Sequence, residues 1–94
     1  MTNLDHTTRN LYQTAMRILN QQPQWVNPDM SADFANHTIT ITQGHTQYKI
    51  QLEEAHGLLI AHTTHNNTTQ HKPIATEQDT TDLFESIYQQ LAAA

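Results

Sequence analysis

The fold is decided by one stretch of the chain, Thr38-Ile39-Thr40-Ile41-Thr42-Gln43-Gly44-His45-Thr46-Gln47-Tyr48-Lys49-Ile50-Gln51-Leu52. Apolar and polar residues alternate on both sides of Gly44-His45, which is the period of a strand with one buried face. A glycine in the first position of a two-residue loop favours a type II′ hairpin turn. This turn pairs Ile41 with Tyr48 and Ile39 with Ile50, so the apolar side chains of both strands share one face.

A third strand is predicted by the apolar run Leu58-Leu59-Ile60-Ala61-His62-Thr63-Thr64, which follows a turn at Glu53–Gly57. If Gly57 takes the left-handed position of a three-residue loop, Leu58 and Ile60 join the apolar face and Leu59 points the other way. A loop of even length would reverse this assignment. We therefore expect a three-stranded antiparallel meander over residues 37–64.

Helices are predicted on both sides of the meander, over residues 3–21 and 77–92. In the first, Leu11, Ala15 and Ile18 recur at helical spacing, and Pro23 ends the helix. In the second, one face consists of Leu83, Phe84, Ile87, Tyr88 and Leu91. Thr76 caps this helix, with Asp79 three residues on.

Two connections complete the chain. Residues 22–36 contain Trp25, Val26, Met30 and Phe34, so we expect a packed connection. Residues 65–75 are almost entirely polar and predict a mobile loop. The fold class is α+β, with one domain over residues 1–94, two layers in the order α-β-β-β-α, and both helices on one face of the sheet.

The composition is unusual for a folded chain. Thr, Gln, Asn and His supply 40 of the 94 residues, whereas Lys and Arg supply four, and the formal net charge is −5. We place these neutral residues on the outer faces of the predicted elements. No cysteine, no apolar run of membrane-spanning length and no leader pattern are visible, which predicts a cytoplasmic protein that does not bind membranes. The low lysine content and the high content of Thr, Gln and His are typical of a bacterial protein.

Catalysis has little support in the sequence. The serines, Ser31 and Ser86, are not in a nucleophile-elbow motif, and no cysteine is present. The two glycines, Gly44 and Gly57, are both placed in turns, so no phosphate-binding loop is available. We therefore expect neither an enzyme nor a cofactor.

The predicted order of one helix, three strands and one helix resembles the double-stranded-RNA-binding domain. That family carries basic residues at the start of its second helix. Here the corresponding positions read Thr76-Glu77-Gln78-Asp79-Thr80-Thr81-Asp82. Carboxylates repel phosphate, so we expect no nucleic-acid binding. No other family resemblance is apparent.

Three histidines, His62, His65 and His71, are candidate ligands for a transition metal. Their spacing is not that of a metal motif, and on one strand His62 and His65 would face opposite sides. The alternative is a set of solvated imidazoles. Protonation of all seven histidines would change the formal charge from −5 to +2, which leaves a pH-sensing role open.

The acidity of the chain is concentrated in its last predicted helix. Glu77, Asp82 and Glu85 form a candidate acidic face, which is either a solvated surface or the binding face of an acidic inhibitor that mimics nucleic acid, of the kind found in phage-like elements. The inhibitor hypothesis predicts a basic protein partner.

The leading prediction is a small, non-catalytic interaction or regulatory module that acts by self-association or through a protein partner. A chain of 94 residues has a thin core, and a homodimer would add burial. The two dimerisation modes that we consider are edge pairing of the first strand and contact between sheet faces. The candidate interface residues are Trp25, Val26, Met30, Thr38, Thr40, Thr42 and Leu59. The acidic inhibitor and histidine-based metal binding are the alternatives.

Overall fold

The computed structural model describes residues 4–21 and 28–93. It contains two helices, five strands and one short 3₁₀ turn. In chain order these are α1 (Leu4–Asn20), β1 (Asp29–Asp33), η1 (Phe34–Asn36), β2 (Thr38–Gln43), β3 (Thr46–Ala55), β4 (Leu58–His65), β5 (Thr68–Pro73) and α2 (Glu77–Ala93).

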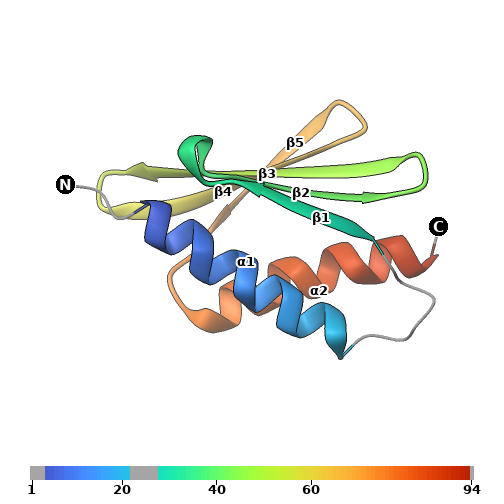
Figure 1. The fold of residues 1–94 in the computed structure, drawn as a ribbon. Helices are drawn as coiled ribbons and strands as arrows, with labels where there is room; N and C mark the ends of the chain where they lie inside the picture. Colours follow the sequence, from blue (N-terminus) through green and yellow to red (C-terminus); the bar gives the residue numbers. More distant parts are fainter. Residues whose placement is uncertain (1–3, 22–27, 94) are drawn as a thin grey trace.

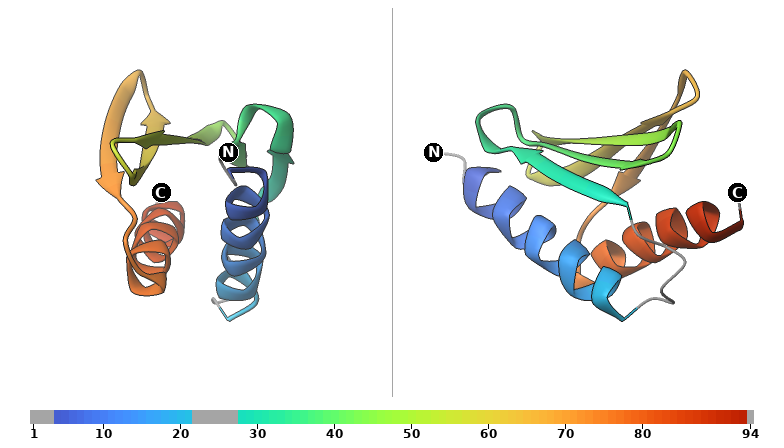
Figure 2. Two further views of the ribbon diagram at one scale, coloured as in Figure 1. Left: turned by 90° about the vertical axis from the view of Figure 1, so that its left-hand side faces the viewer. Right: turned by 45° about the vertical axis from the view of Figure 1, so that its right-hand side comes forward.

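The strands form one antiparallel sheet in the order β1-β2-β3-β4-β5, so each strand pairs with its neighbour in sequence (Figure 1). The α+β class is confirmed, but the prediction of three strands is wrong. With five strands, the chain also departs from the topology of the double-stranded-RNA-binding domain. The sheet is strongly twisted: in both views of Figure 2 the outermost strands are rotated steeply relative to β3.

The central hairpin has the predicted register. Ile41 pairs with Tyr48 and Ile39 with Ile50, across a two-residue turn in which Gly44 has a φ of 61°. A glycine accepts this left-handed conformation at little cost, which explains why the turn forms here.

The next hairpin differs from the prediction. Ala55 pairs with Leu58, so the turn consists of His56 and Gly57, both at positive φ as in a type I′ turn. The loop is even, and Leu59 therefore shares the face of Leu52 while Leu58 points the other way. The assignment of Leu58 and Ile60 to the core face was wrong. Glu53 and Glu54, expected in the turn, belong to β3.

The segment predicted as a mobile loop over residues 65–75 contains β5. Asn66 and Asn67 form a second type I′ turn, with φ values of 53° and 63°, and His65 pairs with Thr68 across it. Asparagine tolerates the left-handed region better than other residues with a side chain, so the Asn-Asn pair fixes this hairpin.

The expected packed connection over residues 22–36 contains β1 and η1. In β1, Met30 and Ala32 alternate with exposed residues and lie opposite Ile41 and Ile39. Residues 22–27 of this connection lie outside the described part of the chain.

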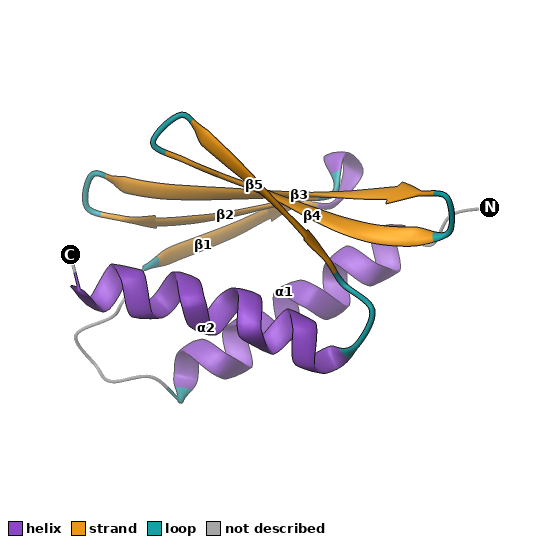
Figure 3. Ribbon diagram, turned by 180° about the vertical axis from the view of Figure 1, so that it is seen from behind, coloured by secondary structure: helices purple, strands orange, loops and turns teal. Residues whose placement is uncertain are grey.

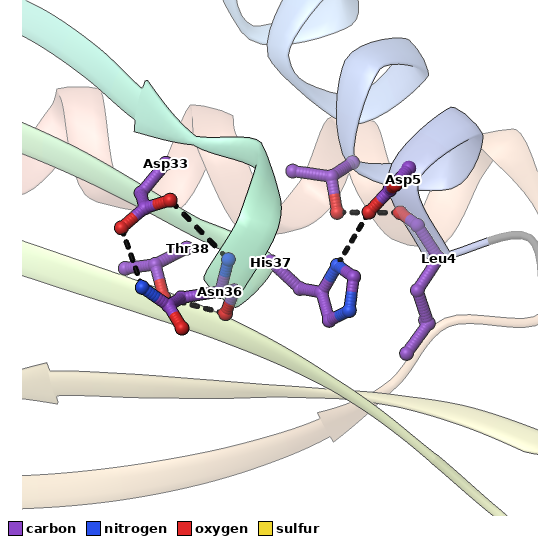
Figure 4. Close-up of polar contacts among 7 residues, drawn as sticks. Leu4, Asp5, Asp33, Asn36, His37 and Thr38 are labelled. Atoms are coloured by element: carbon purple, nitrogen blue, oxygen red, sulfur yellow. Dashed lines mark hydrogen bonds and ion pairs between the residues drawn. The ribbon is translucent and has the colours of Figure 1, made fainter.

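The corner between β1 and β2 is held by polar contacts (Figure 4). The Asp33 carboxylate accepts hydrogen bonds from the side chain and the backbone N–H of Asn36, and these bonds lower the pKa of Asp33. His37 follows at a φ of 53°, and its Nδ1 lies 3.3 Å from the Asp5 carboxylate of α1. This corner ties the start of α1 to the sheet.

Both helices run beneath the strands in Figure 1, and Figure 3 shows the same arrangement from behind. Buried side chains from the two helices and from β2, β3 and β4 form one core cluster. Its members are Leu11, Ala15, Ile18, Ile39, Ile41, Tyr48, Ile50, Leu52, Ala61, Leu83, Phe84, Ile87, Tyr88 and Leu91. The predicted apolar face of the second helix is therefore buried in full.

Helix α2 begins with the predicted capping box. The Thr76 hydroxyl accepts a hydrogen bond from the Asp79 N–H, and the Asp79 carboxylate accepts from the N–H groups of Ala75 and Thr76. The two backbone N–H bonds lower the pKa of Asp79. No helix within residues 4–21 and 28–93 is long and apolar enough to cross a membrane.

Candidate functional site

The two faces of the sheet carry different residues. We call the face whose side chains enter the core the inner face and the opposite one the outer face. Across the outer face, antiparallel pairing aligns polar residues in rows. One row consists of Ser31, Thr40, Lys49, Thr64 and Thr69, and the next of Asp33, Thr38, Gln51, His62 and His71. Apart from Lys49 and Asp33, the side chains of these two rows carry no formal charge when the histidines are neutral.

Three polar side chains meet on the outer face, and we call Glu53, His62 and His71 the outer triad. His62 and His71 are direct partners across β4 and β5. Their Nδ1 atoms lie 2.6 Å apart, and their rings are nearly perpendicular, with centroids separated by 4.5 Å. On the other side of His62, Nε2 lies 3.2 Å from the Glu53 carboxylate. The result is a continuous hydrogen-bonded chain from β3 to β5.

The inner face changes character between β3 and β5. The cross-strand row that includes Ile39 and Ile50 ends with Thr63 and Gln70. The inner face is therefore apolar on β2 and β3 and polar at these positions of β4 and β5. A cavity of about 360 Å³ lies there between the β4–β5 hairpin and α2. Leu83 and Ile87 supply apolar lining from the helix, and we call this space the β5 cavity.

Tyr48 and His65 form one wall of the β5 cavity. Their rings are stacked with centroids 4.1 Å apart, and the Tyr48 hydroxyl donates a 2.6 Å hydrogen bond to Gln90 of α2. Burial raises the pKa of Tyr48, so the phenol stays protonated as a donor. In contrast, the buried hydroxyl of Thr63 has no hydrogen-bonding partner among the described residues. The cavity lining therefore includes the Tyr48 hydroxyl, which is already hydrogen-bonded, and the Thr63 hydroxyl, which is not.

The three predicted metal ligands are not brought together. His62 and His71 are neighbours on the outer face, whereas His65 points to the inner face, where its Nδ1 donates to the Gln47 carbonyl. In the part of the chain that the structure describes, no three His, Cys, Asp or Glu side chains are grouped to hold a metal ion. Glu53, which we predicted to lie in the turn after the second strand, is the acid that contacts His62.

The candidate interface residues are also distributed over several environments. Met30 and Leu59 are half-buried against the core, and Thr38 is buried. Thr40 and Thr42 are half-buried on the outer face. Trp25 and Val26 lie outside the described residues. Because β2 pairs with both β1 and β3, it offers no free edge, and edge pairing through Thr38–Thr42 is wrong.

An exposed apolar patch was missed by sequence reasoning. It consists of Leu58, Ile60 and Pro73 on the outer face. Leu58 is 57% exposed, and it is the one large apolar side chain classed as exposed within the described ranges. Ile60 pairs with Pro73 and is half-buried. The number of residues in the β3–β4 turn determines which face Leu58 is on. A two-residue turn at His56-Gly57 places Leu58 on the outer face, so a prediction of that turn length would have located the patch.

The acidic residues of α2 serve different sides of the helix. Glu77 accepts a 3.0 Å hydrogen bond from Arg17 of α1, beside a groove lined by Leu59 and Ile74. Asp82 accepts from Gln78 and lines the β5 cavity. Glu85 is half-buried. Glu77 is therefore engaged with α1, whereas Asp82 lies at the β5 cavity.

Comparisons with known proteins give no further identification: no family model, no curated protein and no solved structure matches this chain.

Proposed function

We propose that the protein is a non-catalytic interaction module that self-associates through the outer face of its sheet. The observation that supports this most is the apolar patch of Leu58, Ile60 and Pro73. Removing a leucine side chain from water contributes about 1.5–3 kcal/mol, and a two-fold dimer would bury the patch of each copy.

Charge favours the same surface. On the outer face of β3, β4 and β5, Lys49 and Glu53 are of opposite sign, whereas α2 concentrates Glu77, Asp79, Asp82 and Glu85. Two copies with a net charge of −5 repel each other least where their surfaces are neutral. We therefore expect the β3–β5 half of the outer face to meet its equivalent in a second copy.

The lack of cysteine suits a reducing compartment, and we propose the cytoplasm.

Sedimentation velocity tests this proposal. We expect a monomer–dimer equilibrium in the micromolar range and a dissociation constant raised at least tenfold by Leu58→Asp. Gln89→Asp is the matched control, because Gln89 is exposed on α2 and not on the outer face of the sheet. A monomer throughout the high-micromolar range, or a dimer that Leu58→Asp leaves intact, would contradict the proposal.

The unused Thr63 hydroxyl favours a second candidate function, the binding of a small polar molecule in the β5 cavity. Such sites combine apolar lining with a few convergent polar groups. We expect a panel of small carboxylates, amides and polyols to shift the amide resonances of Thr63, His65 and Ser86. Ser86→Trp, which fills the cavity mouth from α2, should abolish the shifts, and an unresponsive native protein would exclude this function for the panel.

A further inference from the structure

We propose that His62 and His71 form a two-ligand transition-metal site and that Glu53, the third member of the outer triad, is a positioning residue that does not bind the metal. This inference does not rest on self-association. It concerns the chain as a monomer and uses side chains that adjoin the apolar patch without belonging to it.

The two imidazole rings already present the same nitrogen to one point in space. Their Nδ1 atoms are 2.6 Å apart, so one donates its hydrogen atom to the lone pair of the other. A metal ion can replace that hydrogen atom. Metal–nitrogen bonds of about 2.0–2.1 Å with tetrahedral angles require donors about 3.3 Å apart. The rings must therefore separate by several tenths of an ångström, which the exposed His71 side chain permits.

Glu53 determines which nitrogen of His62 is available. Its carboxylate accepts a hydrogen bond from Nε2 at 3.2 Å, so the ring proton is held on Nε2 and the Nδ1 lone pair is directed toward His71. A carboxylate behind a ligating histidine fixes the orientation of the ring and makes the nitrogen more basic. Glu53 thus prepares His62 without contacting the metal.

Rigid backbone pairing supports the geometry. His62 and His71 are opposite each other on adjacent strands. Glu53 of β3 pairs with Ile60 of β4 and is therefore diagonal to His62. Cross-strand and diagonal neighbours on one face are within side-chain reach. All three side chains therefore project from paired strands, and the Asn66-Asn67 turn sets the register that brings His71 beside His62.

Two imidazoles leave the remaining coordination positions to solvent. Such a site selects ions that favour nitrogen ligands, and affinity should rise from Zn²⁺ or Ni²⁺ to Cu²⁺. Mg²⁺ and Ca²⁺ prefer oxygen and should not bind. Because a protonated imidazole cannot ligate, binding should weaken when the solution is acidified.

Calorimetric titration with Ni²⁺ at low protein concentration tests the site. We expect one ion per chain, at least tenfold weaker binding in His62→Ala and in His71→Ala, and a smaller loss in Glu53→Gln. His45→Ala is the control, because His45 is exposed in the β2–β3 turn. Circular dichroism establishes that each variant is folded.

A second measurement identifies the ligands directly. Addition of Zn²⁺ should shift the ring resonances of His62 and His71 and leave those of His45 unchanged. Native-like Ni²⁺ affinity in His71→Ala, or equal losses in the variant and control proteins, would overturn the proposal. Failure of the dimer experiment would leave it unaffected, because the titration is read from the monomer.

Discussion

Tyr88 is the residue that most directly joins the two helices. Its ring is fully buried, and its hydroxyl donates a 2.8 Å hydrogen bond to the Ala15 carbonyl of α1. The Met30 sulfur lies 3.4 Å from the Tyr88 hydroxyl oxygen, so β1 also contacts this side chain. Burial, and to a lesser degree Tyr12, raises the pKa of Tyr88 far above its usual value.

Tyr88→Phe should lower the free energy of unfolding by about 0.5–1.5 kcal/mol at neutral pH, the usual contribution of one hydrogen bond. A phenol whose pKa is raised by folding stabilises the native state fully below its ordinary pKa of about 10. That stabilisation is lost as the pH rises further. Urea unfolding at neutral and alkaline pH should therefore show a weaker alkaline loss in the variant than in the native protein. Parallel pH profiles would contradict this role for Tyr88.

At the level of the elements, the strands differ in how clearly an apolar–polar alternation in the sequence predicts them. β2 and β3 have one apolar and one polar face, and the turn at Gly44 agrees with that alternation. β1 has two apolar residues, Met30 and Ala32, which are too few for a recognisable period. β5 has none that face the core, because its inner side lines a polar cavity. Periodicity therefore finds the strands that build the core and misses the edges.

The Asn66-Asn67 turn should decide whether β5 pairs. A β-branched residue in the left-handed region costs about 1–2 kcal/mol, so Asn67→Val should destabilise the β4–β5 hairpin by that amount. Hydrogen exchange should show faster exchange in β5 than in β2 and β3. Gln70→Val, on the strand itself, is the matched control, because valine favours extended backbone. A turn variant with unchanged protection would show that the pairing does not depend on the turn.

On the scale of the whole molecule, the core is small and shared. Side chains from α1, α2, β2, β3 and β4 belong to one cluster, so no element has a core of its own. At about 0.05–0.15 kcal/mol per residue, 94 residues correspond to a total stability of about 5–14 kcal/mol. A single large cavity would remove a substantial part of it.

Phe84→Ala is the test at this scale. Phe84 is 0% exposed at the centre of the cluster, and truncation of a buried phenylalanine costs about 3–5 kcal/mol. Chemical unfolding should shift to much lower denaturant and remain a single transition. At protein concentrations where the monomer prevails, Leu58→Ala should change stability by less than about 0.5 kcal/mol, since its side chain is exposed. Equal effects of the two substitutions would mean that burial does not determine stability here.

The candidate sites were harder to predict than the core, for a physical reason. Sequence spacing correctly separates His62 from His65, because neighbours three apart on a strand point to opposite faces. It cannot bring His71 beside His62 without the Asn66-Asn67 turn, which sets the register of β5. The contact of Glu53 likewise depends on a strand that is longer than its apolar alternation suggests.

The nearest-neighbour order of the strands also has a consequence for the folding rate. Each β-hairpin closes over a short turn, so the sheet assembles from contacts between residues close in the chain, which favours rapid folding. The contacts of α2 with α1 are of much longer range, and the hydrogen bond between Tyr88 and Ala15 joins residues 73 positions apart. During synthesis α1 and the strands emerge before α2, so the part of the core that α2 completes stays open until that helix leaves the ribosome. Apolar surface that is exposed during this interval makes the nascent chain prone to aggregation.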